Sequence, residues 1–361
     1  MITILQPHIP HYREDFFIEL SKKWRLNLFC YDVSASKSDN FSSANIPVKK
    51  IKCVKAGPFM AYNPFSILTS ECKCLILMLN FGHLTTWLLI LTKIFHKKKI
   101  ILWGHGISVK RYMSELKSPS MLLRWMIWLS DGVFFYTEKE LAIWKQRMPD
   151  KQMVSLNNTI SKVEELVNRR QIDIATLKKK YSIHQNFVLI YCARFNNSYR
   201  RVDLLIQAMK TLDPTKFAFI VIGGGKLKPD FTMYENVYDY GEVYEKHKKD
   251  ELFQMANAYY QPGWVGLSIV EAMAYGKPVL TFSRSVHLKQ CVEFAYIKSD
   301  FNGIVFDDFE QFLQILPKLS TELVDTMGKN AIEFVTKHLL MSNMINKADE
   351  LLKCLMDDEK V

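Results

Sequence analysis

Two arginines follow a run of apolar residues in the second half of the chain. Arg194 comes directly after FVLIYCA, and Arg200 lies six residues further on. In doubly wound α/β sheets, ligands bind beyond the carboxyl ends of the strands, so both side chains are candidates for ligand contact. A guanidinium donates paired hydrogen bonds to phosphate oxygens better than an ammonium does. The pair therefore indicates a diphosphate site, with a solvated charge at a helix start as the alternative for Arg200.

Glycines follow the next two apolar runs. Gly223 to Gly225 come after FAFIVI, and Gly241 comes after NVYDY. Glycine allows the backbone to approach a ligand closely or to adopt positive φ, which makes Gly224 and Gly241 candidate ligand-binding positions. The triple glycine lacks the spacing of a dinucleotide fingerprint. An ordinary tight turn is the alternative for each glycine.

The segment QPGWVGLSIVEAMAYGKPV carries more information. Pro262 ends a predicted strand, and a helix is predicted over 267–275, ending at Gly276. The amino end of a helix favours a phosphate through its N–H groups and dipole. Apolar residues surround Glu271, which predicts a partly buried and paired carboxylate that accepts hydrogen bonds from vicinal hydroxyls. The candidate donor-binding residues of this segment are Gly263, Gly266, Leu267, Ser268 and Glu271.

Apolar runs alternate with polar helical segments through both halves of the chain. This pattern predicts parallel sheets covered by helices, and 361 residues suit two domains. We therefore expect an α/β protein with two doubly wound, Rossmann-like lobes facing each other across a cleft. The first lobe is predicted over 1–158, a polar helical connector over 159–184, the second lobe over 185–335, and a C-terminal helix over 336–361, packing back toward the first lobe.

Charge is divided unevenly between the halves. Residues 1–155 hold 22 Lys and Arg against 11 Asp and Glu, whereas residues 156–361 hold 26 of each, so the whole net charge of +11 lies in the first half. A basic lobe beside a neutral one predicts an anionic partner such as a lipid surface, a lipid-linked phosphate or a nucleic acid. Solubility alone is the other interpretation.

Several classes of protein are disfavoured. The seven cysteines lack paired spacing, which is typical of reduced thiols in a cytosol. The first residues do not read as a secretory signal, and polar residues interrupt the apolar stretch 75–91. No DxD or His/Asp cluster follows a strand, so we expect no metal site, and His8 and His11 lack a supporting carboxylate.

These residues give the second half a resemblance to the retaining family-4 glycosyltransferases of the GT-B fold, also called group 1 glycosyl transferases. The similar segments are ARFNNSYRRVDLLIQAM, VIGGGKL, YGEV, EAMAYGKPV and SDFNGIVF. The resemblance implies that Arg194 and Arg200 hold the donor diphosphate, that the YGEV region lies near the base, and that Glu271 binds the nucleotide ribose. It also implies retention at the anomeric carbon and no metal requirement.

The first half resembles the same family at shorter segments. LNNTI at 156–160 is similar to the turn that ends the first lobe, and His105 in WGHG is similar to a histidine near the donor sugar. PHIPHYREDFF resembles the first loop of some members, which implies that His11, Tyr12 and Arg13 border the acceptor and the donor phosphate. We expect His105 to donate or accept a hydrogen bond and not to abstract a proton.

One departure from the family pattern concerns the donor sugar. The family has two glutamates separated by seven residues, and Gly263 stands where the first belongs. The carboxylate that contacts donor sugar hydroxyls is therefore missing, although a Pro-Gly sequence at this point is a recognisable variant. Ala193 also replaces the family's glycine before Arg194.

The expected activity is that of a retaining, metal-independent glycosyltransferase of hexosyltransferase type. It would move a sugar from a nucleotide-diphosphate donor to a hydroxyl of a glycan or lipid-linked acceptor, in bacterial polysaccharide, O-antigen or lipid-linked oligosaccharide synthesis. We expect no cofactor and no nucleic-acid partner, and a cytoplasmic location, peripheral on the inner face of the plasma membrane. Two alternatives stay open: a GT-B-fold nucleotide-sugar epimerase, and a non-catalytic binder of membranes or nucleic acids that uses the basic lobe.

Overall fold

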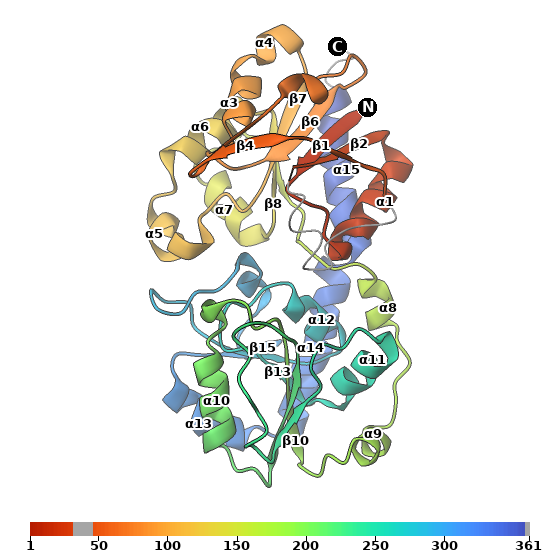
Figure 1. Cartoon of the computed structure of the whole chain (residues 1–361), viewed down its shortest axis with the longest axis vertical. Helices are drawn as coiled ribbons and strands as arrows, with labels where there is room; N and C mark the ends of the chain where they lie inside the picture. The colour runs from red at the N-terminus through yellow and green to blue at the C-terminus, as the bar shows by residue number, and fades with distance from the viewer. Residues whose placement is uncertain (32–45, 358–361) are drawn as a thin grey trace. The chain divides into compact units, whose positions relative to one another are not determined.

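A computed structural model describes residues 1–31 and 46–357 of the chain (Figure 1). The chain divides into two compact units. Unit 1 comprises Met1–Lys162 with Leu340–Val361, and unit 2 comprises Val163–Leu339. Each unit is built on one parallel sheet with helices, so the prediction of two doubly wound α/β lobes is confirmed. The last four residues of the predicted C-terminal helix, 358–361, lie outside the described residues.

The sheet of unit 1 has the strand order β3-β2-β1-β6-β7-β8-β9, and all neighbours are parallel. Its central strands are fully buried, as their continuous apolar sequences predict. A separate antiparallel hairpin is formed by β4 (Cys53–Ala56) and β5 (Phe59–Tyr62). The sheet strands are β1 (Ile2–Gln6), β2 (Leu26–Cys30), β3 (Val48–Lys50), β6 (Cys74–Met78), β7 (Lys99–Trp103), β8 (Gly132–Phe135) and β9 (Met153–Ser155).

The helices of unit 1 come from its long N-terminal segment and from the C-terminal end of the chain. The C-terminal helix α15 (Met341–Asp357) packs on α1 and on strands β8 and β9. Asp349 of α15 accepts hydrogen bonds from Lys23 at 2.9 Å and from the Trp24 indole at 2.8 Å. The other helices are α1 (Glu14–Lys23), α3 (Leu84–Leu91), α4 (Lys93–His96), α5 (Tyr112–Lys117), α6 (Met121–Leu129) and α7 (Glu138–Lys145).

The sheet of unit 2 has the strand order β12-β11-β10-β13-β14-β15, again with parallel neighbours. Figure 1 shows α10 and α13 on one side of β10 and β13, and α11 on the other. The strands are β10 (Phe187–Cys192), β11 (Phe217–Ile222), β12 (Val237–Asp239), β13 (Ala258–Tyr260), β14 (Val279–Phe282) and β15 (Gly303–Phe306). The helices are α8 (Val163–Val167), α9 (Ile174–Lys180), α10 (Val202–Thr211), α11 (Lys246–Met255), α12 (Ser268–Ala274), α13 (Phe309–Ile315) and α14 (Thr321–His338).

The polar segment predicted as a connector contributes α8 and α9 to unit 2. Lys180 and Tyr181 at the end of α9 both donate to the carboxylate of Glu251 on α11, at 2.7 Å and 2.6 Å. These charge-assisted bonds hold α9 against the unit although it carries few large apolar residues.

Two local features depart from what their sequences favour. The sequence of 85–96 favours a single helix, but the structure breaks it into α3 and α4 at Thr92, and Lys97 ends α4 with a left-handed φ of 54°. Thr137 stands at the amino end of α7, where its residue type favours a helix cap, but its hydroxyl bonds the Glu140 carboxylate and caps no backbone N–H.

Two findings concern the cysteines and the helices. All seven cysteines are free thiols, as their spacing predicts. Across residues 1–31 and 46–357, none of the helices has the length and apolar character needed to span a membrane.

Candidate functional site

The residues predicted to bind a ligand in unit 2 collect where the strand order reverses. This reversal lies between β10 and β13, and such a switch point opens a crevice beyond the carboxyl ends of the strands. The loop 193–201 follows β10, and the segment 261–267 follows β13. Arg194, Arg200, Gly263 and Gly266 therefore lie at the edge of the sheet where a ligand is expected.

Arg200 and its neighbour Arg201 differ in what they contact. The Asn197 side chain accepts a hydrogen bond from the Tyr199 N–H at 2.9 Å and starts the short helix η4 (Ser198–Arg200). Arg201 follows with a left-handed φ of 52°, and its guanidinium pairs with Asp203 at 2.7 Å. Within the described chain, the Arg200 side chain makes neither a hydrogen bond nor an ion pair. Its charge is therefore available to a ligand.

Arg200 lies near a group of ionisable residues around Cys192. Burial raises the pKa of the Cys192 thiol to about 11, while the cations of Lys249 and Arg200 oppose that rise. Lys249 donates to both carboxylate oxygens of Glu271, at 2.7 and 2.8 Å. Burial works against the Lys249 cation, but Cys192 and Glu271 outweigh it, so the pKa of Lys249 lies above its ordinary value. The prediction of a partly buried, paired Glu271 is confirmed, and its partner is on α11.

The structure supplies a physical reason for a glycine at position 263. A Cβ built on Gly263 would lie 2.4 Å from the Tyr199 carbonyl oxygen and 3.0 Å from Cγ of Arg201. The ring of Trp264, a residue with φ of 51°, stacks on the ring of Tyr199 at a centroid distance of 5.1 Å. The backbone of the arginine loop therefore fills the space that a side chain at position 263 would need.

A buried glutamine holds this tight segment in place. Gln261 is fully buried, and its amide nitrogen donates to the carbonyls of Gly263 at 3.1 Å and Trp264 at 2.8 Å. Its amide oxygen accepts from the hydroxyls of Ser268 at 2.9 Å and Tyr259 at 2.6 Å. Since one amide satisfies both sides of the turn, Gln261 links the end of β13 to the start of α12.

The predicted start of α12 is displaced by one residue. Leu267 is the residue before the first helical turn, and α12 begins at Ser268, whose hydroxyl is taken up by Gln261. The N–H groups of Gly266 and Leu267 have no hydrogen-bond partner in the part of the chain that the structure describes. A Cβ on Gly266 would make ordinary contact with Cys291, at 3.8 Å from Sγ and 4.0 Å from Cβ. These two N–H groups can donate hydrogen bonds to an anion.

The glycines that follow β11 and β12 lie in two loops that are joined by a hydrogen bond. The Gly223 N–H donates to the Gly241 carbonyl at 2.7 Å. Gly241 has a φ of 64°, and a Cβ on Gly224 would approach Glu242 Oε1 to 2.7 Å. The positive φ favours glycine at position 241, whereas at position 224 the nearest atoms belong to the exposed side chain of Glu242, which can move.

Arg194 lies toward the loop that follows β12. The hydroxyl of Tyr244 donates to Glu242 at 2.9 Å, which raises the tyrosine's pKa, and the Arg194 cation opposes that rise. The two predicted arginines therefore lie toward different neighbours, with Arg194 near the loop after β12 and Arg200 near Cys192.

In unit 1, His105 lies in an aromatic and cationic environment at the end of β7. Its ring meets the Tyr136 ring edge-on at a centroid distance of 4.4 Å. Burial, together with the nearby Arg13 cation, lowers the pKa of His105 to about 4. The imidazole is therefore neutral at pH 7, which suits the predicted hydrogen-bonding role and not that of a cationic acid.

The predicted acceptor-side loop forms the short helix η1 (His11–Arg13), and its side chains differ in exposure. His11 is exposed and Tyr12 half-buried, whereas Arg13 is only 6% exposed. The Arg13 guanidinium lies 4.8 Å from the Trp103 ring and 3.2 Å from the side-chain oxygen of Asn158. Arg13 thus ties the first loop to the strand ends that also carry His105.

The neutral state of His105 predicts a pH-dependent stability. Its folded pKa of about 4 lies below the unfolded value of 6.5, so between these values the unfolded chain binds more protons and stability falls as the pH decreases. The wild-type unfolding free energy should fall as the pH is lowered from about 7.5 to about 5. In His105→Asn we expect this fall to be smaller by about 2 kcal/mol. Urea denaturation at both pH values measures this.

His83 provides the matched control, because burial and Lys55 also lower its pKa to about 4. His83→Asn should reduce the fall in unfolding free energy by a similar amount, and the double variant should reduce it by the sum of the two amounts. An unchanged pH dependence in His105→Asn would contradict the neutral assignment.

Residues 186–321 match the model of the family described as glycosyl transferases group 1. This range holds the candidate ligand-binding residues of unit 2. None of the curated proteins matches the sequence.

Solved structures match over nearly the whole chain. HepE of Anabaena in complex with UDP has a TM-score of 0.67 at 16% identity, covering 98% of this chain and 99% of that one. A glycosyltransferase from Rickettsia africae gives 0.61 at 16% identity, covering 98% of each chain. WaaG, described as a glycosyltransferase of lipopolysaccharide biosynthesis, gives 0.59 at 15% identity over 97% of this chain and 99% of that one. The fold is therefore the GT-B fold.

Sequence reasoning missed three residues of these sites. Lys249, the partner of Glu271, lies on a helix whose basic residues look like an exposed charge run. Asn158 was noticed only as part of LNNTI, and its contact with Arg13 spans 145 residues. Gln261 precedes the Pro-Gly pair, and a polar residue directly after a buried strand was the available signal.

In the two described stretches, no three His, Cys, Asp or Glu side chains come together in a way that could hold a metal ion.

Proposed function

We propose that this protein is a glycosyltransferase that moves a sugar from a nucleotide-diphosphate donor to an acceptor hydroxyl. The observation that carries the proposal is the group of charges around Cys192 at the switch point of a segment that matches a glycosyltransferase family. Within the described residues the Arg200 side chain has no hydrogen-bond or ion-pair partner, whereas Glu271 is held by Lys249. An available cation and a fixed carboxylate in one group suit a ligand with both phosphates and hydroxyls.

The donor is proposed to be a uridine diphosphate sugar. The HepE structures contain UDP and UDP-glucose, and the present chain shares their fold. Arg194 and Arg200 contact the diphosphate, with the N–H groups of Gly266 and Leu267 beside them. Glu271, oriented by Lys249, accepts hydrogen bonds from the ribose hydroxyls.

The reaction is proposed to proceed with retention and without a metal ion. The bond between the anomeric carbon and the diphosphate oxygen breaks, the acceptor oxygen bonds to that carbon, and the hydroxyl proton passes to the departing phosphate. The negative charge that builds on the diphosphate is stabilised by the arginines in place of a divalent cation. His105 is proposed to act as a neutral imidazole that donates or accepts a hydrogen bond.

The acceptor is proposed to be a glycan or a lipid-linked oligosaccharide, as in bacterial polysaccharide or O-antigen synthesis. His11 and Tyr12 are the first-loop side chains accessible to it, whereas the burial of Arg13 assigns that residue to positioning the loop. With such an acceptor, the protein is proposed to act in the cytoplasm.

A screen of nucleotide sugars tests the donor proposal. We expect UDP and one UDP-sugar to raise the thermal unfolding midpoint, because a ligand at 100 times its Kd adds about 2.7 kcal/mol of stability. Adenosine diphosphate is the control. Stabilisation by no nucleotide diphosphate would contradict the proposal.

Incubation of the stabilising donor without acceptor separates the rival activities. A transferase leaves the sugar configuration unchanged apart from slow hydrolysis, whereas an epimerase changes it, and NMR of the sugar distinguishes the two.

If Arg194→Ala kept full activity while loss of Lys97, Lys98 and Lys99 removed it, a binder that uses the basic lobe would be the better account.

A further inference from the structure

Helices α3 and α4 of unit 1 expose a stripe of large apolar side chains. Leu84, Leu88 and Leu91 follow helical spacing on α3 and are 49%, 50% and 62% exposed. Ile94 and Phe95 on α4 are 74% and 78% exposed. The sequence of α3, LTTWLLIL, contains no charged residue, so nothing on this helix gives it a solvated polar face.

Helix α6 exposes a second stripe next to the first. Met121, Leu122, Trp125 and Trp128 are between 45% and 68% exposed, while the alternate face of the helix is buried in the core. Helix α6 packs directly on α3, and the Nζ of Lys93 on α4 donates to the Leu129 carbonyl of α6 at 3.2 Å. The exposed side chains of α3, α4 and α6 therefore belong to one contiguous region, here called the apolar face.

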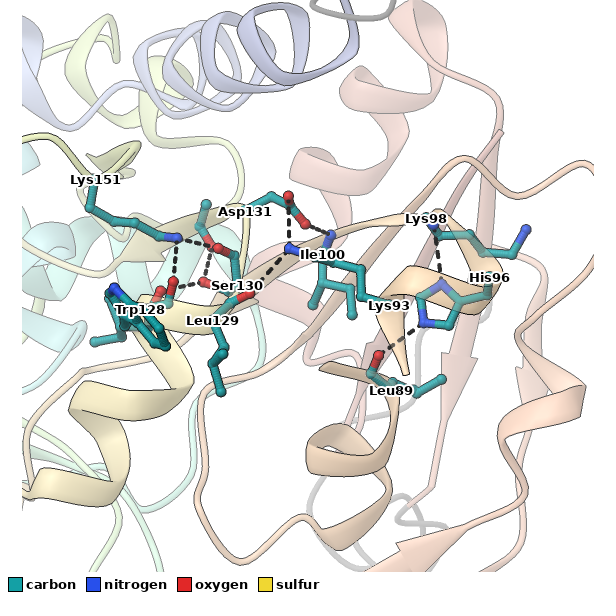
Figure 2. A network of polar contacts seen from close by, with 12 residues as sticks. Leu89, Lys93, His96, Lys98, Ile100, Trp128, Leu129, Ser130, Asp131 and Lys151 are labelled. Carbon is teal, nitrogen blue, oxygen red and sulfur yellow. Dashed lines mark hydrogen bonds and ion pairs between the residues drawn. The ribbon is translucent and has the colours of Figure 1, made fainter. Parts of the chain in front are cut away.

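A polar network fixes the orientation of α6. Figure 2 shows two lysines converging on its carboxyl end: Lys93 contacts Leu129 and the Asp131 carboxylate, and Lys151 contacts Trp128 and Ser130. Asp131 also accepts a hydrogen bond from the Ile100 N–H at 2.8 Å. Cations at a helix carboxyl end stabilise it, so α6 is held with Trp125 and Trp128 outward.

The concentration of exposed apolar side chains is unusual. Within the described chain, 20 large apolar side chains are exposed, and nine of them lie on these three helices. Scattered exposed apolar residues need no explanation, but contiguous ones mark an interaction site.

The surroundings of the apolar face are basic. Residues 84–131 contain eight Lys and Arg against two Asp and Glu, a net charge of +6. Both acids are paired, Glu115 with Arg111 at 2.9 Å and Asp131 with Lys93 at 3.1 Å.

A pocket of about 800 Å³ opens at the end of the apolar face nearest the carboxyl end of α6. Trp125 and Trp128 line it together with the cations of Arg124, Arg147 and Lys151, and Asp150 contributes one negative charge. Within the described residues, the side chain of Arg124 has no hydrogen-bond or ion-pair partner. Aromatic rings beside cations suit the interface between acyl chains and phosphate headgroups.

We propose that the apolar face of α3, α4 and α6 is a docking surface for an anionic phospholipid bilayer. The apolar side chains enter the outer acyl region, and the pocket between α6 and residues 147–151 receives a lipid phosphate. Contact with a second copy of this chain would bring two regions of net charge +6 together, which an anionic bilayer does not. The proposal goes beyond the transfer reaction and does not depend on it.

Vesicle cosedimentation tests the docking surface. Wild-type protein is expected to bind vesicles of phosphatidylcholine with phosphatidylglycerol at about 0.1 M salt, and to bind phosphatidylcholine vesicles at least tenfold more weakly. Because charge attraction is screened, binding to the anionic vesicles should weaken at about 1 M salt. Trp125→Ser with Trp128→Ser should weaken it at least tenfold, and Arg124→Gln should weaken it less.

Met233→Ser provides the matched control, since Met233 is 74% exposed but lies in unit 2. It should bind vesicles like the wild type. A thermal unfolding midpoint within about 2 °C of the wild type would show that all these variants fold, and this measurement does not involve the nucleotide site of the proposed function. Equal vesicle binding by the double tryptophan variant, or a wild-type dimer that this variant dissociates in sedimentation equilibrium, would overturn the proposal.

Discussion

Replacement of Arg200 by alanine should lower kcat/KM for sugar transfer by a factor of about 100 to 1,000. The guanidinium lies at the switch point of the unit 2 sheet and has no hydrogen-bond or ion-pair partner in the described chain, so its charge is available to the departing diphosphate. Removing one preorganised donor from an oxyanion site costs about 3 to 4 kcal/mol in transition-state stabilisation, which corresponds to that factor. Initial rates of nucleotide diphosphate release, with donor and acceptor varied, measure the effect.

The same substitution should leave the thermal midpoint within about 2 °C of the wild type, because the side chain makes no hydrogen bond or ion pair with the described residues that could be lost. Arg201→Gln is the matched control. Its charge is already paired with Asp203, so we expect a change of less than about tenfold in kcat/KM. If Arg201→Gln lost as much activity as Arg200→Ala, the assignment of the free charge to Arg200 would be wrong.

Gly263→Glu, which restores the carboxylate of the family pattern, should damage the protein. Its Cβ would lie 2.4 Å from the Tyr199 carbonyl, and a carboxylate would also be forced into a buried position. Overpacking costs about 1 to 3 kcal/mol, and burying a charge adds to it. We expect a lower urea midpoint for unit 2 and loss of UDP stabilisation, since the loop carrying Arg200 must move.

Two alanine variants separate packing from charge. Gly263→Ala should lower the unfolding free energy by about 1 to 3 kcal/mol, because the Cβ alone meets backbone. Gly266→Ala places its Cβ in ordinary contact with Cys291 at 3.8 Å and should change stability by less than about 0.5 kcal/mol. Equal stability of the two variants would refute the packing explanation for Gly263.

The sequence predicted the elements well because the buried parallel strands are continuous apolar runs. The register of the strands and the switch points of the sheets follow from those runs and their order. The loop positions of Arg194, Arg200 and Gly263 could therefore be predicted from the sequence. The paired state of Glu271 was also predictable from its apolar neighbours. Its partner Lys249 was not, because helix packing between residues 22 apart decides which lysine reaches it.

Other properties of the sites depend on contacts that no local pattern contains. Arg13 and Arg200 both follow turn residues at a strand end, yet one is buried against Trp103 and the other is left without a side-chain partner in the described chain. Likewise, the composition of α6 fits a core helix or a surface helix, and only the packing of α3 and the network at Asp131 assign Trp125 and Trp128 to the outside.

The buried amide of Gln261 has a consequence for how such a site can evolve. It holds the Pro-Gly segment in a shape in which position 263 faces backbone and Trp264 is left-handed, so no single substitution can supply a carboxylate there without unfolding the turn. A lineage that adopts this arrangement would need coordinated changes at the amide, the glycine and the arginine loop to return. The donor preference of such a protein can then change only by substitution of residues outside this turn.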